Sequence, residues 1–243
     1  MNIYIDAGNT NIKCLLSYEG SEEFQVIPSF EFNEGLSKLL ADCVDVDQIW
    51  VSSVLSNDFN TWLGDFTEGL GFSKPVFVQS VKTCCGISIG YDVPEQFGVD
   101  RFLALLAAYH NNKQDQVVID VGTAITVDAM LATGKHLGGV IIPGYQAMQN
   151  ALMQSTSAVG GNTQGSLNIY SKNTTDALTT GCYYAVSEGI NGIIRQMLQD
   201  FERPPQITLT GGGAGLLKSE IKGDVTYFEN LVLNGLKVMA KFS

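Results

Sequence analysis

The sequence predicts an α/β protein of two domains, each a mixed sheet flanked by helices, with a cleft between them. Three observations predict this class. Residues 2–30 alternate short apolar runs with turn residues, which is typical of a three-stranded antiparallel meander. Helical periods and short buried strands then alternate as far as about residue 110. From Gln116 the chain repeats its opening pattern of a strand, Asp-x-Gly, a small polar residue and a second strand.

In the first half, apolar runs predict strands at "QIWVSSV" and "PVFVQ". Helical spacing predicts helices from about Glu34, around "NDFNTWLGDF" and over "FGVDRFLALLAAYHN". The predicted order is three strands, a helix, a strand, a helix and a strand. This is the element order of a ribonuclease-H-like unit. The polar run "NNKQDQ" is the best boundary, so we expect ribonuclease-H-like domains at residues 1–114 and 115–243.

The second half predicts strands at "QVVIDV", "AITVDAM" and "HLGGVIIPG". A long helix from Asp176 to about Phe201, a strand "QITLT", the cluster "GGGAG" and an amphipathic helix around "ENLVLNGLKVMA" follow. Because the pattern of a strand, Asp-x-Gly and a second strand occurs twice, the two Asp-x-Gly turns are expected to face each other across the cleft. Small molecules commonly bind in such a cleft.

Composition excludes several classes of partner. The 243 residues are 45% hydrophobic and 16% charged, as in a folded protein. The net charge is -11 and no basic run occurs, so nucleic acid is not expected as a partner. Apolar runs such as "FLALLAAY" are far shorter than a spanning helix, so no membrane association is expected.

Cysteine usage and the start of the chain predict a cytoplasmic location. No signal-peptide pattern precedes the first strand. The five cysteines form no CxxC pair, and reduced thiols are the simplest interpretation. Adjacent Cys84 and Cys85 could form a redox switch, although two small residues packed in a loop are the favoured alternative.

The opening turn, "DAGNTNIK", suits a phosphate. Gly8 would let backbone N–H groups approach phosphate oxygens, and Asn9, Thr10 and Lys13 would add donors. Asp6 makes sense there only if a divalent cation such as Mg²⁺ bridges it to the phosphate. Alone, this motif would favour an ordinary hairpin turn. Its repeat, with Asp120, Gly122, Thr123 and Thr126, favours a nucleotide clamp.

Other nucleotide motifs are missing from the sequence. There is no G-x-x-x-x-G-K-[ST] loop, and "GGGAG" fails the G-x-G-x-x-G spacing because Leu216 takes the last position. The glycine cluster could let an adenine ring lie against bare backbone, or it could be only a strand-to-helix turn.

A third constellation is "GYDVPEQFGVDRF", in which Asp100 and Arg101 begin a helix. A carboxylate there is favoured by the helix dipole, stays ionised beside the guanidinium, and could accept the proton of an attacking alcohol. For an isolated Asp-Arg pair, a helix-end charge is the better interpretation. His110 and His136 are expected to be surface or packing residues.

Together, "DAGNTNIK", "YDVPEQFGVDR", "DVGTAITVD", "GGVIIPG", "NTTDALTTG" and "LTGGGA", in this order over nearly the whole chain, resemble a type III pantothenate kinase. That family belongs to the superfamily of acetate kinase, sugar kinases, heat-shock chaperones and actin. The resemblance implies phosphorylation of pantothenate by ATP, the first step of coenzyme A biosynthesis, with Mg²⁺ and a monovalent cation, K⁺ or NH₄⁺.

The resemblance also implies a role for individual residues. Asp100 would be the catalytic base, and Asp120 would ligate the monovalent cation. Residues implied to bind ATP are Asp6, Ala7, Gly8, Asn9, Thr10, Asn11, Ile12, Lys13 and Thr123. Residues implied to bind pantothenate are Tyr91, Gly98, Val99, Asp100, Arg101 and Thr174. Members are homodimers with the pantothenate pocket at the dimer interface, for which the helix Phe102 to Tyr109 and the Met-containing helix after Gly144 are the candidates.

Two rival hypotheses remain. A regulatory accessory protein of the same fold would lack kinase activity, and retention of Asp100 and both phosphate loops favours the enzyme. An ATP-driven conformational protein would be expected to carry a large additional substrate-binding or polymerising segment, which this chain lacks.

Overall fold

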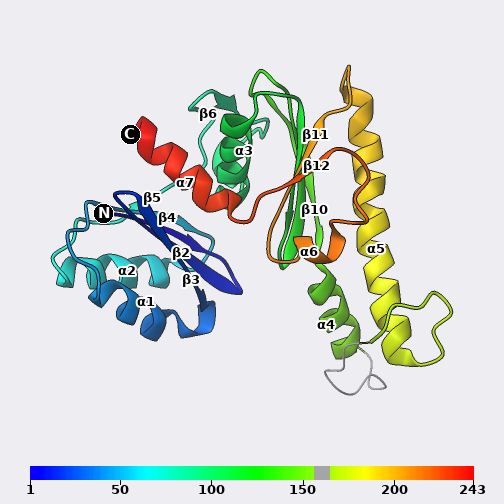
Figure 1. Cartoon of the computed structure of the whole chain (residues 1–243), viewed down its shortest axis with the longest axis horizontal. Coiled ribbons are helices and arrows are strands. Elements are labelled where there is room, and N and C mark those ends of the chain that lie inside the picture. The colour runs from blue at the N-terminus through cyan, green and yellow to red at the C-terminus, as the bar shows by residue number, and fades with distance from the viewer. Residues whose placement is uncertain (156–164) are drawn as a thin grey trace. The chain divides into compact units, whose positions relative to one another are not determined.

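The chain forms two compact α/β units, each built on a mixed five-stranded sheet (Figure 1). The structure is a computed structural model and describes residues 1–155 and 165–243. The first unit comprises Met1–Lys113, Thr133–His136 and Asn230–Ser243, and the second comprises Gln114–Ala132 and Leu137–Glu229. The predicted class, two domains that each contain a mixed sheet with flanking helices, is confirmed.

The first sheet has the order β3-β2-β1-β4-β5. Its strands are β1 (Asn2–Ala7), β2 (Asn11–Tyr18), β3 (Ser21–Pro28), β4 (Gln48–Ser53) and β5 (Val76–Phe77). The first three strands pair antiparallel, which confirms the predicted meander, and β4 and β5 continue the sheet in parallel with β1. The carboxyl ends of β1 and β4 therefore meet at one edge, where residue Asp6 pairs with Ser52.

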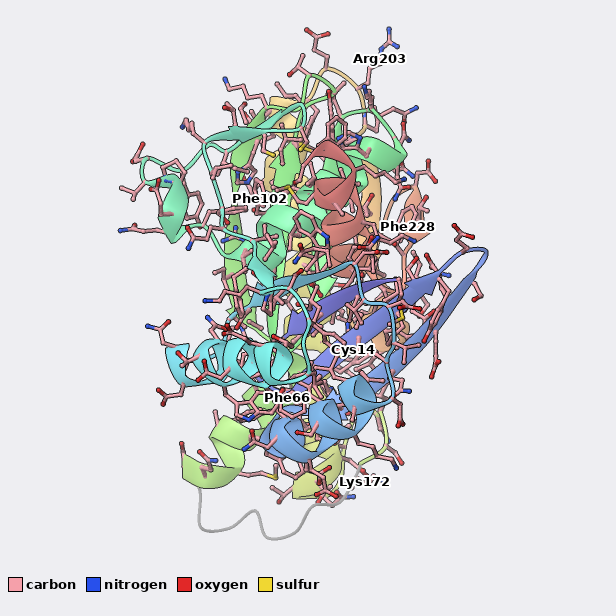
Figure 2. The ribbon with its side chains drawn as sticks, turned by 90° about the vertical axis from the view of Figure 1, so that its left-hand side faces the viewer. Cys14, Phe66, Phe102, Lys172, Arg203 and Phe228 are labelled. Atoms are coloured by element: carbon pink, nitrogen blue, oxygen red, sulfur yellow. The ribbon has the colours of Figure 1, made fainter. Side chains whose placement is uncertain are left out.

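Alternation along the strands explains which face of this sheet is covered by α1 (Phe32–Ala41) and α2 (Asn57–Gly69). Ile3, Ile5 and Ala7 of β1 point into a core that these two helices complete. Figure 2 labels Cys14 on β2 and Phe66 on α2, both of which belong to this core. The intervening Tyr4 and Asp6 must point to the opposite face. Asp6 is thus kept out of the apolar core by strand periodicity.

The second sheet has the order β10-β9-β8-β11-β12, which repeats that of the first. Its strands are β8 (Gln116–Val121), β9 (Ala124–Met130), β10 (His136–Pro143), β11 (Gln206–Thr210) and β12 (Val225–Tyr227). Antiparallel β8 and β9 are joined by the second Asp-x-Gly turn, and β11 runs parallel to β8. The repeat recognised in the sequence is therefore a repeat of topology.

In the described part of the second unit there are three α-helices, and the longest carries much of the core of this unit. They are α4 (Tyr145–Ser155), α5 (Thr174–Met197) and α6 (Ala214–Leu217). One face of α5 buries Tyr183, Val186, Ile190 and Ile194 against the apolar side chains of β8, β9 and β11. Asn173 caps α5, since its Oδ1 accepts a hydrogen bond from the Asp176 backbone N–H at 2.8 Å. Within the described residues, the helices are all too short or too polar to cross a membrane.

The C-terminal helix returns to the first unit. Helix α7 (Leu231–Phe242) packs along α3 (Val99–Asn111) and also contacts β1 and β4. The continuous second domain expected over residues 115–243 therefore does not describe residues 230–243, nor the short segment Thr133–His136. The physical reason is the apolar face of α7, whose Leu231, Leu233 and Leu236 are buried.

Burial of α3 also changes one expectation about the surface. Residues Phe102 to Tyr109 are all buried within the chain, so this helix does not offer the dimer surface predicted for it. Three-residue 3₁₀ helices at Ser29–Glu31, Pro94–Gln96 and Leu198–Asp200 and the hairpin of β6 (Thr83–Cys84) and β7 (Ile87–Ser88) complete the described elements.

Gly235 allows the close approach of α7 to α3, because a Cβ at this position would collide with the backbone carbonyl of Leu103. We expect Gly235→Ala to lower the free energy of unfolding by about 1–3 kcal/mol, the usual cost of overpacking. Urea denaturation measures the change. Gly64→Ala on α2 is the control: nothing lies within 4 Å of its new Cβ, and it should stabilise the helix by about 0.5–1 kcal/mol. Equal stability of Gly235→Ala and the wild type would contradict this packing.

Candidate active site

The first predicted phosphate loop is the tight turn between β1 and β2. Register places Asp6 directly opposite Lys13, so the two side chains share one face of the sheet. Gly8 N donates to the Asn11 carbonyl at 3.1 Å and closes the turn. Ser29 fixes the turn from outside: its hydroxyl donates to the Gly8 carbonyl at 2.6 Å, and its N–H donates to the Thr10 carbonyl at 3.0 Å. Ser29 was not predicted to take part, because its only signal in the sequence is that of a small polar residue after Pro28.

The residues of this loop divide by exposure into two groups. Asn9, Thr10 and Asn11 are exposed, whereas the side chains of Ala7 and Ile12 are buried in the core. Ala7 and Ile12 can therefore offer a ligand only their backbone groups. Gly8 is not in the positive-φ region that its role suggested. Its Cβ would lie 3.2 Å from the Asn11 carbonyl oxygen, so the glycine is favoured by tightness of the turn.

Asp100 lies in the first turn of α3, after the N-cap residue Gly98. Its Oδ1 accepts a hydrogen bond from the Arg101 backbone N–H at 2.8 Å. Among the described residues its second oxygen, Oδ2, has no hydrogen-bond partner. The carboxylate is half-buried, and one of its oxygens is held at the N-terminus of the helix. One carboxylate oxygen is thus oriented and the other is available to accept a proton.

Gly98 leaves room for this carboxylate. A Cβ at position 98 would lie 2.6 Å from Asp100 Oδ1, which is too close for any real contact. We expect Gly98→Ala to displace the Asp100 carboxylate and to lower kcat by about 10²-fold, the effect of a 1 Å misplacement of a catalytic group. Steady-state kinetics measures the effect, with Gly189→Ala on α5 as a control whose Cβ meets nothing within 4 Å. Unchanged kcat in Gly98→Ala would contradict this role.

Arg101 is held in an aromatic setting and is only 5% exposed. Its guanidinium donates from Nη1 to the Tyr91 hydroxyl at 2.8 Å, and its Cζ lies 4.6 Å from the centre of the Phe97 ring and 5.6 Å from that of Tyr91. Cation–π contact and the hydrogen bond fix the plane of the guanidinium. The link between Arg101 and Asp100 that the sequence placed in the side chains runs through the Arg101 backbone N–H.

His136 and Lys82 extend this cluster and were not predicted to take part in it. His136 is 1% exposed; its ring centre lies 4.9 Å from that of Phe97, and its Nδ1 accepts from Gly90 N at 3.3 Å. It therefore packs, as the sequence suggested, but it packs against the ring that supports Arg101. Lys82 Nζ donates to the Tyr91 carbonyl at 3.2 Å. No local signal could have found His136, because it belongs to Thr133–His136, a segment distant in sequence that joins the first unit where β10 begins.

In the second unit, glycine-containing turns converge on the turn between β8 and β9. Gly144 N donates to the Thr123 carbonyl at 2.9 Å, and Gly213 N donates to the Val121 carbonyl at 2.8 Å. Thr123 is exposed, and Asp120 pairs with Thr126 across the two strands. Side chains at these glycines would prevent the backbone from coming this close to the β8–β9 turn, since a Cβ at Gly144 would lie 2.6 Å from the Thr123 carbonyl oxygen.

The glycine cluster borders Asp120. Gly211 follows β11 with φ +98°, and any side chain there would collide with Asp120 Oδ1 and the Val121 carbonyl. The run "GGGAG" is thus a strand-to-helix turn that leads into α6, and it also lines one side of the Asp120 carboxylate. Both properties require small residues at the same place.

The described residues contain no cluster of three His, Cys, Asp or Glu side chains that could hold a metal ion. Asp6 and Asp120 each stand at the end of a central strand, so each unit offers one carboxylate there. A single carboxylate of this kind, such as Asp6, has the oxygen ligands that Mg²⁺ takes together with waters and substrate phosphates. Thr174 lies in the second unit, exposed at the first residue of α5, and its contact with pantothenate remains a prediction.

The fold defines a class: a two-unit α/β protein in which both units have a mixed five-stranded sheet of the same topology. The chain resembles a putative 2-dehydro-3-deoxygalactonokinase from Sinorhizobium meliloti with TM-score 0.62 at 11% identity, covering 99% of this chain and 96% of the other. It also resembles a structure titled a conserved putative Baf family transcriptional activator from Campylobacter jejuni, with TM-score 0.60 at 23% identity and 98% coverage of both chains. Likeness at these identities shows the fold alone.

The particular family follows from sequence. The family model for type III pantothenate kinase matches residues 2–196. A type III pantothenate kinase from Laribacter hongkongensis is 30% identical over 244 residues, covering 100% of both chains, and one from Nitrosospira multiformis is 30% identical over 98% of this chain and 90% of the other. The chain belongs to the type III pantothenate kinase family.

Proposed function

We propose that this protein transfers the γ-phosphoryl group of ATP to the primary hydroxyl of pantothenate, which forms 4′-phosphopantothenate at the start of coenzyme A biosynthesis. The observation that carries the proposal is the Asp100 carboxylate, held by one oxygen beside the buried Arg101 and with the other oxygen available. Family membership supplies the substrate pair. No observation favours the rival regulatory function.

In the proposed reaction, Asp100 Oδ2 accepts the hydroxyl proton while the hydroxyl oxygen attacks the γ-phosphorus. The bond from that phosphorus to the bridging oxygen breaks, and ADP leaves. Because the transferred group passes through a loose transition state, catalysis depends on positioning and on neutralising charge. Arg101 supports the positioning by pairing with the pantothenate carboxylate through its planar guanidinium. Tyr91, Gly98 and Val99 complete the acceptor side.

ATP is contacted in this proposal by the β1–β2 turn, residues Asp6 to Lys13, and by Thr123. Exposed Asn9, Thr10 and Asn11 offer polar groups, and Lys13 offers an ammonium group on the same sheet face as Asp6. Mg²⁺ would join Asp6 to the phosphates, which explains a carboxylate in a phosphate loop.

Asp120 is the proposed ligand of K⁺ or NH₄⁺. Replacing K⁺ by Na⁺ at constant ionic strength should lower kcat by about tenfold, equivalent to about 1.4 kcal/mol of transition-state stabilisation. Initial rates in K⁺, NH₄⁺ and Na⁺ measure this, and Asp120→Asn should reduce the difference. Identical rates in all three cations would count against Asp120 as a cation ligand.

A homodimer is part of the proposal, and an apolar hollow of about 410 Å³ between α4 and α5 supports it. Ala147, Met148 and Ala151 of α4 line the hollow together with Leu178 and Ala185 of α5. The Met-containing helix expected at the dimer surface is α4, none of whose residues is buried in the chain. Ala151→Asp should shift the sedimentation coefficient toward that of a monomer, and an unchanged dimer would remove this face from consideration.

The five free thiols agree with a cytoplasmic location.

The function is tested by ADP release. Purified protein with ATP, Mg²⁺ and K⁺ should release ADP only when pantothenate is added. The alcohol analogue of pantothenate, which lacks the carboxylate, serves as the matched acceptor and should be used with a higher KM. ADP release that is indifferent to pantothenate would contradict the proposal.

A further inference from the structure

Three sulfur atoms meet at the β6–β7 hairpin, in the first unit. Cys84 Sγ lies 2.9 Å from Cys85 Sγ and 3.6 Å from the thioether sulfur of Met239 on α7. Cys84, Cys85 and Met239 are each partly exposed. The proposed kinase reaction uses none of these residues.

The hairpin turn is what brings the two thiols together. Neighbouring residues of a regular strand point to opposite faces. Here Cys85 has φ +49° and Gly86 has φ +90°, so a left-handed two-residue turn replaces the extended backbone after Cys84. Positive φ is costly for a residue other than glycine, asparagine or aspartate, which makes Cys85 an unusual choice for a mere turn.

Contacts with α3 hold this turn in place. His110 Nε2 lies 2.8 Å from the Cys85 carbonyl oxygen, and a Cβ at Gly86 would lie 2.9 Å from the Tyr109 ring. Ser88 N also donates to the Gly134 carbonyl at 2.9 Å. The sulfur atoms are therefore presented by a hairpin that is fixed to its neighbours.

We propose that Cys84, Cys85 and Met239 form a binding site for one soft monovalent metal ion of the copper(I) class. Thiolate and thioether sulfur select such ions over the hard cations of the kinase reaction. Two thiolates and one neutral thioether supply a trigonal donor set. Binding exchanges two thiol protons for the ion, and the protons pass to the solvent.

Geometry agrees with this exchange. A coordinated thiol loses its proton outright. Metal–sulfur bonds of about 2.3 Å would set the sulfur atoms about 4 Å apart in a trigonal site. The Cys84–Met239 distance of 3.6 Å is close to that value, and rotation about the Cys85 Cα–Cβ bond would lengthen the Cys84–Cys85 distance of 2.9 Å.

The site lies at the far end of α3 from the proposed base. Tyr109 and His110 are in the last turn of this helix, whereas Asp100 is in the first. The ion would join the hairpin to α7 and should stabilise the fold, because a ligand that binds only the native state raises the melting temperature. The proposal does not depend on the kinase reaction, and metal binding is read independently of activity.

The test is an anaerobic titration of the reduced full-length chain with copper(I), in competition with bicinchoninate. We expect one tightly bound ion per chain, a rise in Tm, and kcat unchanged in the three sulfur variants. Cys84→Ser and Cys85→Ser should each abolish tight binding, and Met239→Leu, which keeps the volume but not the sulfur, should weaken it about tenfold. Cys182→Ala, which removes a buried thiol on α5, is the control and should bind like the wild type.

Three results would overturn the inference. They are tight binding retained by the Cys84→Ser, Cys85→Ser double variant, a Met239→Leu affinity equal to that of the wild type, and a loss of affinity in Cys182→Ala as large as in Cys85→Ser. If the hairpin variants prove unstable, Met239→Leu alone decides whether three sulfur atoms act together.

Discussion

Replacement of Asp100 by asparagine is expected to lower kcat by about 10²- to 10⁴-fold, the contribution of a positioned general base. Asparagine keeps the shape of the side chain, and its Oδ1 can still accept the hydrogen bond from the Arg101 backbone N–H that is 2.8 Å long in the wild type. It loses the ability to take up the hydroxyl proton. Folding, and the KM for ATP, should therefore change little.

Asp92→Asn is the matched control, because Asp92 is an exposed carboxylate in the same connection before α3. It should keep kcat within about twofold, since exposed substitutions away from a site have small effects. Single-turnover measurements at saturating ATP and pantothenate give the rate of the chemical step. If Asp100→Asn and Asp92→Asn turn over alike, another group is the base.

Replacement of Arg101 should chiefly raise the KM for pantothenate. A hydrogen bond between charged groups contributes about 1.5–3 kcal/mol, which corresponds to an increase of about 10- to 100-fold in KM for pantothenate in Arg101→Met. Arg101→Lys should recover only part of the loss, because an ammonium group cannot pair through two parallel hydrogen bonds or stack on Phe97 as the guanidinium does.

The preference for pantothenate over its carboxylate-free analogue distinguishes two roles of Arg101, which are recognition of the substrate carboxylate and stabilisation of the fold. The wild type should prefer pantothenate over this analogue, and Arg101→Met should treat the two more equally. Tyr91→Phe removes only the hydroxyl that contacts Arg101. Its preference for pantothenate over the analogue should be smaller than that of the wild type and larger than that of Arg101→Met. An unchanged preference in Arg101→Met, together with a lowered Tm, would mean that Arg101 has a structural role only.

Most of the fold was predictable because its signals are local. Alternation in residues 2–30 defines the meander, and the repeated Asp-x-Gly pattern predicted two sheets of one topology, both of which the structure confirms. The return of α7 to the first unit was not predictable in this way. An amphipathic helix shows that it has an apolar face, but the sequence does not say that α3 will cover it at Gly235.

The candidate site could be proposed from the sequence where its residues lie within one motif, and the roles given to these residues stay predictions. Asp100, Arg101 and the two Asp-x-Gly turns were recognised from short stretches of sequence. The surroundings of Arg101 were not, because His136 meets Tyr91 and Phe97 only when the segment Thr133–His136 joins the first unit. Ser29 was missed for a similar reason, since its hydrogen bond to Gly8 joins residues 21 positions apart.

The adjacent cysteines show a different limit of sequence interpretation. Packing in a loop was the favoured hypothesis for Cys84 and Cys85, and the loop is indeed the β6–β7 hairpin. Nothing local indicates that Met239, 155 positions away, approaches the same point. Only the folded chain brings the third sulfur to the pair.

The most direct test of the central claim is to identify the product. Purified protein supplied with pantothenate, ATP, Mg²⁺ and K⁺ should yield pantothenate carrying one phosphoryl group by mass spectrometry, with the phosphate on the primary hydroxyl by NMR. Asp100→Asn should yield almost none under the same conditions. Unchanged pantothenate in the presence of folded wild-type protein would contradict the assignment of a pantothenate kinase.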